Sequence, residues 1–126
     1  MSKQHVDMET AARLEVIATI DPTHYIACVC RAVALGLRGK VKEGLKEVER
    51  AILLDTEGWD AYFWKGMLSA YYYRGRFHLE ETRAAIEQSL TQGLPPILLT
   101  PLYWLESDLP DVFVNYAKPL LLRYEV

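Results

Sequence analysis

Apolar residues recur at helical spacing along almost the whole chain. Leu45, Val48 and Ile52, for example, lie three and four positions apart, which places them on one face of an α-helix. The sequence lacks a convincing stretch of alternating apolar and polar residues, the pattern of a half-buried strand. The pattern therefore predicts an all-α protein of about seven helices, joined by short connections into an antiparallel array of helical hairpins.

Glycine, proline and charged residues interrupt this pattern and set the limits of the predicted helices. The clearest interruptions are Asp21-Pro22, the turns at residues 38–40 and 74–76, and the segment 92–96. The predicted helices cover residues 7–19, 23–38, 41–54, 59–73, 77–91, 97–106 and 109 onward. Pro119 falls inside the last of them, where a proline is expected to kink or stop the helix.

Two hairpins in the middle of the chain repeat one another. Gly39 and Gly75, which lie 36 positions apart, each occupy an Arg-Gly-Lys/Arg turn. After its turn, the first hairpin has small, large, small, large and acidic residues at Gly44, Val48, Ala51, Leu54 and Asp55. Before its turn, the second hairpin has an aromatic residue, Tyr62, followed by a glycine, Gly66. With this period and these residues, the segment 25–93 resembles the tetratricopeptide repeat family, whose repeats are about 34 residues long. The sequence departs from the family pattern at Arg31, Gly44, Thr56 and Lys65.

The resemblance implies a right-handed superhelix of stacked hairpins. A single domain would span residues 1–126, with an N-terminal helix (7–20), a first repeat (23–56), a second repeat (59–93) and a C-terminal hairpin or cap (97–126). Stacking is what buries the second face of each hairpin, because two amphipathic helices cannot cover both of their apolar faces alone. Gly66 is expected where two helices of neighbouring hairpins touch.

Aromatic residues surround the helix predicted over residues 59–73 on all sides. The family resemblance puts this helix on the inner wall of the array and implies an apolar groove that binds a partner, because large exposed aromatic patches usually mark a contact surface. The alternative is that these side chains form core, covered by the N-terminal helix or by the last hairpin. The predicted partner-binding residues are Phe63, Trp64, Met67 and Tyr71, with Val29, Cys30, Val33 and Leu37 from the preceding repeat.

Basic residues gather at the turns inside the two hairpins. Stacked hairpins bring these turns to one edge, where they would form a basic ridge that suits an acidic protein surface or phosphates. The alternative is a solvated edge without a partner. The residues of this ridge are Arg38, Lys40, Lys42, Arg74 and Arg76.

Composition and charge exclude several classes of protein. Of the 126 residues, 51% are hydrophobic and 25% are charged, as in ordinary globular domains. The net charge of −3, from 14 basic and 17 acidic residues, argues against nucleic acid as the partner. A membrane partner is not expected either, because no run approaches the roughly 20 apolar residues of a membrane span.

Candidate chemistry is sparse. His24 and Cys28 could touch on one helix face, but two ligands do not make a zinc site, and the adjacent Glu80 and Glu81 diverge on a helix. Cys28 and Cys30 are interpreted as small buried residues in a reducing compartment, which predicts a cytoplasmic protein. We therefore expect no enzymatic activity, no metal and no cofactor.

The function expected from these features is a tetratricopeptide-like protein–protein interaction module that holds a peptide or protein in its apolar groove. The alternative is a homo-oligomerising structural or scaffold domain, for example a homodimer, or a sensor segment of a larger regulator. The apolar C-terminal residues 120–122 and Tyr124 need cover. The last hairpin, a further repeat, a second copy or a larger parent chain would each provide it.

Overall fold

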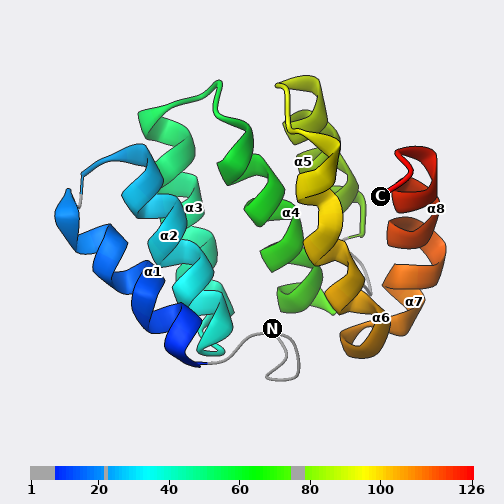
Figure 1. The fold of residues 1–126 in the computed structure, drawn as a ribbon, viewed down its shortest axis with the longest axis horizontal. Coiled ribbons are helices and arrows are strands. Elements are labelled where there is room, and N and C mark those ends of the chain that lie inside the picture. Colours follow the sequence, from blue (N-terminus) through cyan, green and yellow to red (C-terminus); the bar gives the residue numbers. More distant parts are fainter. Residues whose placement is uncertain (1–7, 22, 75–78) are drawn as a thin grey trace.

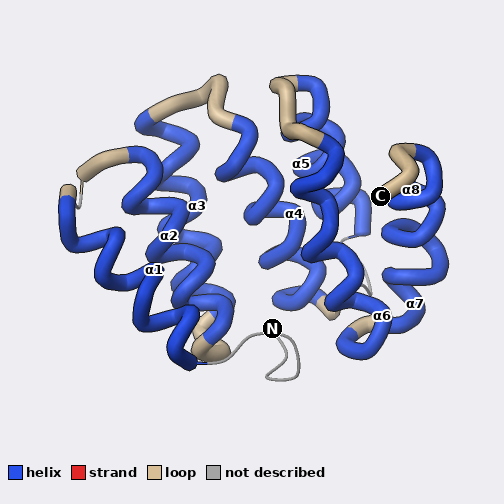
Figure 2. The backbone as a smooth tube through the Cα atoms, in the orientation of Figure 1, coloured by secondary structure: helices blue, strands red, loops and turns tan. Residues whose placement is uncertain are grey.

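Helices account for nearly all of the part of the chain that the computed structural model describes, which is residues 8–21, 23–74 and 79–126. Five regular α-helices come first, and two composite helical segments follow. The described residues form no strand (Figure 2). The prediction of an all-α array of helical hairpins with seven helices is confirmed. The first five helices are α1 (Met8–Ile20), α2 (Tyr25–Leu37), α3 (Val41–Leu54), α4 (Trp59–Tyr73) and α5 (Leu79–Thr91).

Successive helices lie side by side and run in alternating directions (Figure 1). Helices α2 and α3 form one hairpin and α4 and α5 the next, while α1 packs on α2 and α3 on α4. The connections α1–α2 and α3–α4 therefore meet at one edge of the array, at the top of Figure 1, and the α2–α3 turn lies at the opposite edge. The N-terminal ends of α2 and α4 consequently share an edge.

The C-terminal third is more irregular than predicted. The helix expected over residues 97–106 begins as a 3₁₀ helix, η1 (Pro96–Trp104), and ends as α6 (Leu105–Asp108). Pro101 lies inside η1 and has no N–H to donate to an α-helical hydrogen bond. The last helix consists of α7 (Pro110–Val112), the π-helical segment η2 (Phe113–Ala117) and α8 (Lys118–Arg123).

Pro119 does not end the last helix, because a π-helical turn precedes it. The Lys118 N–H donates to the carbonyl of Phe113, five residues back. One extra residue in this turn is the usual way in which a helix accommodates a local misfit. The helix then continues to Arg123, so the predicted disturbance is present as a wide turn.

Two glycines allow the helices of each hairpin to approach closely. A Cβ atom added to Gly44 of α3 would lie 2.9 Å from the carbonyl oxygen of Ala32 in α2. A Cβ added to Gly66 of α4 would lie 2.5 Å from Cγ1 of Ile86 in α5. Gly66 thus lies at a helix contact as predicted, but the contact joins the two helices of one hairpin and not two neighbouring hairpins.

The first hairpin also supports the start of the second. Helix α4 has no side-chain cap at Gly58. Instead, the Ala61 N–H donates to the hydroxyl oxygen of Tyr25 in α2 at 2.9 Å. A Cβ on Gly58 would collide with the same Tyr25 hydroxyl, so a glycine is needed where the chain passes this ring.

The buried side chains form two clusters that meet along α4. The first joins α1, α2 and α3 to one side of α4. The second joins the other side of α4 to α5 and the C-terminal segments. Leu120 and Leu121, each 2% exposed, belong to the second cluster. The last segment of the chain therefore folds back and covers these two leucines itself.

We predict that Gly66→Leu lowers the free energy of unfolding by ~1–3 kcal/mol, the usual cost of overpacking a close contact. Thermal and urea melts followed by circular dichroism measure this change. Ala12→Leu, on the exposed face of α1, is the control and should change stability by less than about 0.5 kcal/mol. An unchanged Tm for Gly66→Leu would contradict the close approach of α4 and α5.

Candidate functional site

Three of the predicted groove residues are part of the core. Phe63, Met67 and Tyr71 are 2%, 0% and 9% exposed, because the C-terminal segments pack over them. The Tyr71 hydroxyl donates to Oδ2 of Asp108 in α6 at 2.5 Å, which ties α4 to those segments. Burial and the Asp108 carboxylate raise the pKa of Tyr71 far above its ordinary value, so this hydroxyl stays protonated. These three side chains do not line an open groove, and the alternative reading of them as core describes the structure.

The remaining predicted groove residues line an apolar cleft of about 320 Å³ between α2, α4 and η1. Helix α2 contributes four side chains to it and α4 contributes Trp64. Almost the whole wall is hydrocarbon, aromatic ring or sulfur. The residues that line the cleft are Val29, Cys30, Val33, Leu37 and Trp64, together with Thr10, Leu14, Pro101 and Trp104.

Trp64 lies where the two core clusters meet and packs against both. Its ring centroid is 6.0 Å from that of Trp104 and 5.3 Å from that of Phe63. Unlike Phe63, Trp64 keeps part of its surface exposed. The sequence pattern missed Leu14, Pro101 and Trp104 as cleft residues. Only a recognisable third repeat could have predicted the last two, and residues 97–126 lack its diagnostic glycine.

A carboxylate stands beside this apolar surface. Asp60 precedes Trp64 by one turn of α4 and is half-buried. Burial raises the pKa of Asp60, which shows that water solvates this carboxylate poorly. The pKa of the Cys30 thiol is raised as well, first by its own burial and then by the charge of Asp60. The charge of Asp60, in the first turn of α4, thus acts on Cys30, which lines the cleft.

The basic ridge is present in part. Arg38, Lys40 and Lys42 lie at the α2–α3 turn and Arg74 ends α4 with a left-handed backbone (φ 55°), all four of them exposed. Arg76 lies outside the described residues. Arg38 is not a free cation, because its guanidinium binds both oxygens of Glu15 in α1 at 2.9 and 2.6 Å. This bidentate pair lowers the pKa of the Glu15 carboxyl.

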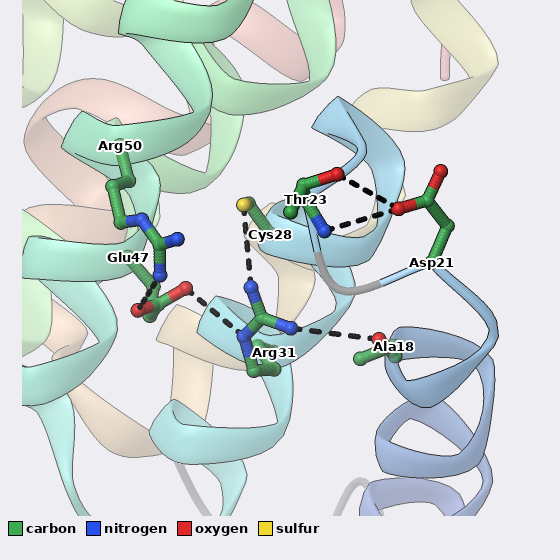
Figure 3. Close-up of polar contacts among 7 residues, drawn as sticks. All are labelled: Ala18, Asp21, Thr23, Cys28, Arg31, Glu47 and Arg50. Carbon is green, nitrogen blue, oxygen red and sulfur yellow. Dashed lines mark hydrogen bonds and ion pairs between the residues drawn. The ribbon is translucent and has the colours of Figure 1, made fainter.

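Arg31 explains one departure from the repeat pattern. Its Nε donates to Oε2 of Glu47 in α3 at 3.0 Å, and its two other nitrogens reach the Ala18 carbonyl at the end of α1 and the sulfur of Cys28 (Figure 3). Arg50 binds the second oxygen of Glu47 at 3.3 Å. A polar link between α1, α2 and α3 thus occupies the position where the family usually has Leu.

A larger hollow of about 590 Å³ lies on the other side of α4, between α3 and α5. Its walls are mostly polar or charged, and Lys65, the second departure from a family leucine, binds Glu49 there at 2.9 Å. Among the described residues, the apolar part of this wall consists of the ring of Tyr62 and two alanines, Ala84 and Ala85, and lacks a large aliphatic side chain or a tryptophan. The cleft beside Trp64 is the better binding surface, since buried aromatic and aliphatic anchors supply most binding energy.

His24 and Cys28, which lie one helical turn apart in the sequence, have separate structural roles. Nδ1 of His24 accepts the Ile26 N–H at 3.1 Å and caps α2, while Cys28 is 0% exposed. Within the described ranges, no three His, Cys, Asp or Glu side chains lie together as a metal site. No helix in the described part of the chain is long and apolar enough to cross a membrane.

Comparisons with family models, with curated proteins and with solved structures find no match to this chain. The resemblance to tetratricopeptide repeats therefore remains a prediction from the sequence. The function has to be argued from the cleft itself.

Asp60→Asn is predicted to make Cys30 react faster with iodoacetamide near pH 8. The substitution removes a negative charge that disfavours the thiolate, so the pKa of Cys30 falls and its reactive fraction rises. Peptide mass spectrometry after a timed reaction distinguishes Cys30 from the buried Cys28. Asp111→Asn, a first-turn aspartate in α7, is the control and should leave the rate unchanged. Equal rates in wild type and Asp60→Asn would remove Asp60 from the neighbourhood of the cleft.

Proposed function

We propose that this protein is a non-enzymatic protein–protein interaction module that holds a segment of its partner in the cleft beside Trp64. The observation that carries the proposal is an apolar cleft with a partly exposed tryptophan that packs against both core clusters. Half-exposed Trp side chains beside aliphatic walls are frequent anchors of protein interfaces. The cleft lies on helices, so the scaffold loses little conformational freedom when a partner binds.

The volume of the cleft fits side chains and not a folded surface. About 320 Å³ accommodates two or three apolar side chains of a partner segment and lies at the lower end of the sizes of pockets that hold whole small molecules, about 300–1,000 Å³. A helix or extended peptide that inserts such side chains between α2 and α4 would use the helix-in-groove or strand-like modes of recognition. Localisation in the cytoplasm and the tetratricopeptide-like nature of the repeats belong to the same proposal.

Self-association is the second candidate function, and a separate observation favours it. The outer face of α1 exposes Val16 and Ile20, which are 64% and 81% accessible. At the other end of the array Leu122 is 68% accessible. Terminal helices of stacked repeats usually turn a polar face to water, so a second copy could cover these side chains and form a homo-oligomeric scaffold.

Trp64→Ala is the test of the cleft. We expect the variant to unfold cooperatively and to lose less than the ~3–5 kcal/mol that truncation of a fully buried tryptophan costs. Peptides selected from a displayed random library on the wild-type protein should bind the variant at least ~30-fold more weakly, which is the loss of ~2 kcal/mol typical of a hot-spot residue. Binding that is equal to both proteins would contradict the proposal.

Analytical ultracentrifugation of the wild type and of Ile20→Glu tests self-association. If α1 forms an interface between copies, the wild type should sediment above the monomer mass of 14.5 kDa, and a buried charge at position 20 should return it to the monomer. Glu43→Gln, in the first turn of α3, is the control. A monomeric wild type at millimolar concentration would exclude this second function.

A further inference from the structure

The edge at which α2 and α4 begin is acidic, whereas the opposite edge carries the basic ridge. Both connections at this edge, α1–α2 and α3–α4, contribute carboxylates (Figure 1). We define the acidic edge as Asp21, Asp55, Glu57 and Asp60. Asp21 accepts hydrogen bonds from Thr23 and Asp55 accepts one from the Glu57 N–H, so these two shape their own turns.

None of these four carboxylates has a cationic partner among the described residues. The ion pairs found there engage Glu9, Glu15, Glu47 and Glu49 instead. Asp60 differs from the other three, because it is half-buried where they are exposed. A half-buried carboxylate without a cation is unfavourable, and a partner that supplies the cation relieves this cost.

We propose that the cleft selects a basic-apolar segment, in which aliphatic or aromatic side chains fill the cleft and a Lys or Arg side chain binds Asp60. This inference rests on the proposed function and specifies the chemistry of the partner. Two features meet on α4: the apolar cleft, which Trp64 lines, and the half-buried, unpaired carboxylate of Asp60 one helical turn before Trp64.

The arrangement also fixes the direction of the bound segment. Asp60 lies in the first turn of α4, at the acidic edge, and Leu37 is the last residue of α2, beside the α2–α3 turn that carries Arg38 and Lys40. The cationic residue of the partner therefore lies at the acidic edge and its apolar residues follow along α2 toward the basic ridge. A peptide that presents a carboxylate at the Asp60 end is rejected, because like charges at a desolvated contact repel.

A library of displayed random dodecapeptides, selected in parallel on three immobilised proteins, tests this inference. The proteins are the wild type, Trp64→Ala and Asp60→Asn, each first shown by circular dichroism to be folded. Peptides enriched on the wild type should combine Lys or Arg with apolar residues. One enriched peptide is then synthesised twice, as selected and with each basic residue replaced by Gln, and titrated by fluorescence anisotropy.

We expect the basic peptide to bind Asp60→Asn at least about tenfold more weakly than wild type, close to the lower limit measured for interfacial charge pairs. The Gln peptide should bind both proteins equally, and Asp60→Glu, which keeps the charge, should restore part of the affinity for the basic peptide. Asp111→Asn is the matched control and should bind like the wild type. Added salt should weaken only the basic peptide, because it screens the charge pair.

The other outcomes separate this inference from the proposed function. Enriched peptides that need Trp64 but contain no excess of Lys or Arg, or that bind Asp60→Asn as tightly as wild type, would overturn the inference and leave the binding function intact. Enrichment of acidic peptides would overturn it as well. Failure to enrich any peptide on wild type over Trp64→Ala would overturn both.

Discussion

The structure depends on one constraint: helix α4 carries apolar side chains around most of its circumference, and most of that circumference has to be covered. Its Leu68 faces the first hairpin, Gly66 admits α5, and Phe63, Met67 and Tyr71 face the C-terminal segments. A helix that is hydrophobic all round is stable only when it is surrounded. The two core clusters thus cover two sides of α4, and the irregular C-terminal third completes the second cluster.

At the cleft, the two clusters leave part of α4 uncovered. Trp64 contacts both clusters, yet neither covers it fully. Helix α2 approaches it from one side and η1 from the other, and about 320 Å³ stays open between them. Asp60 lies one helical turn before Trp64, and its carboxylate could be buried more deeply only with a cation as its partner. Both features, the open apolar space and the unpaired charge, arise because the start of α4 is packed by α2 and Tyr25 but not closed by η1.

The sequence predicted the helices well wherever the apolar period was unbroken and the ends were marked by Gly, Pro or charge. Helices α3 and α4 have the predicted bounds, and Gly66, predicted as a contact residue from its match to the repeat pattern, lies at a helix contact. The 3₁₀ and π segments could not be predicted, since they depend on how Pro101 and Pro119 fit against neighbours and not on local propensity. The structure leaves one part of the predicted groove open, at Trp64 and α2, and buries the other part, for a related reason. Periodicity says that Phe63 and Trp64 point in different directions, but which of them is covered depends on a C-terminal segment that has no repeat pattern.

Stability and recognition are assigned to different side chains of the same helix, and this separates their response to mutation. Phe63, Met67 and Tyr71 pack against the C-terminal segments, so substitutions of these residues act on folding and affect the cleft only indirectly. Trp64 and Asp60 are partly exposed beside these segments, so substitutions of these two residues alter the surface that a partner would meet while most of the buried contacts remain. Gly58 and the Tyr25–Ala61 hydrogen bond set the approach of α2 to the start of α4, and this approach helps to set the width of the cleft. The geometry of the cleft is therefore a consequence of core packing, whereas the chemical preference that we propose for it rests on Trp64 and Asp60, which both keep part of their surface exposed.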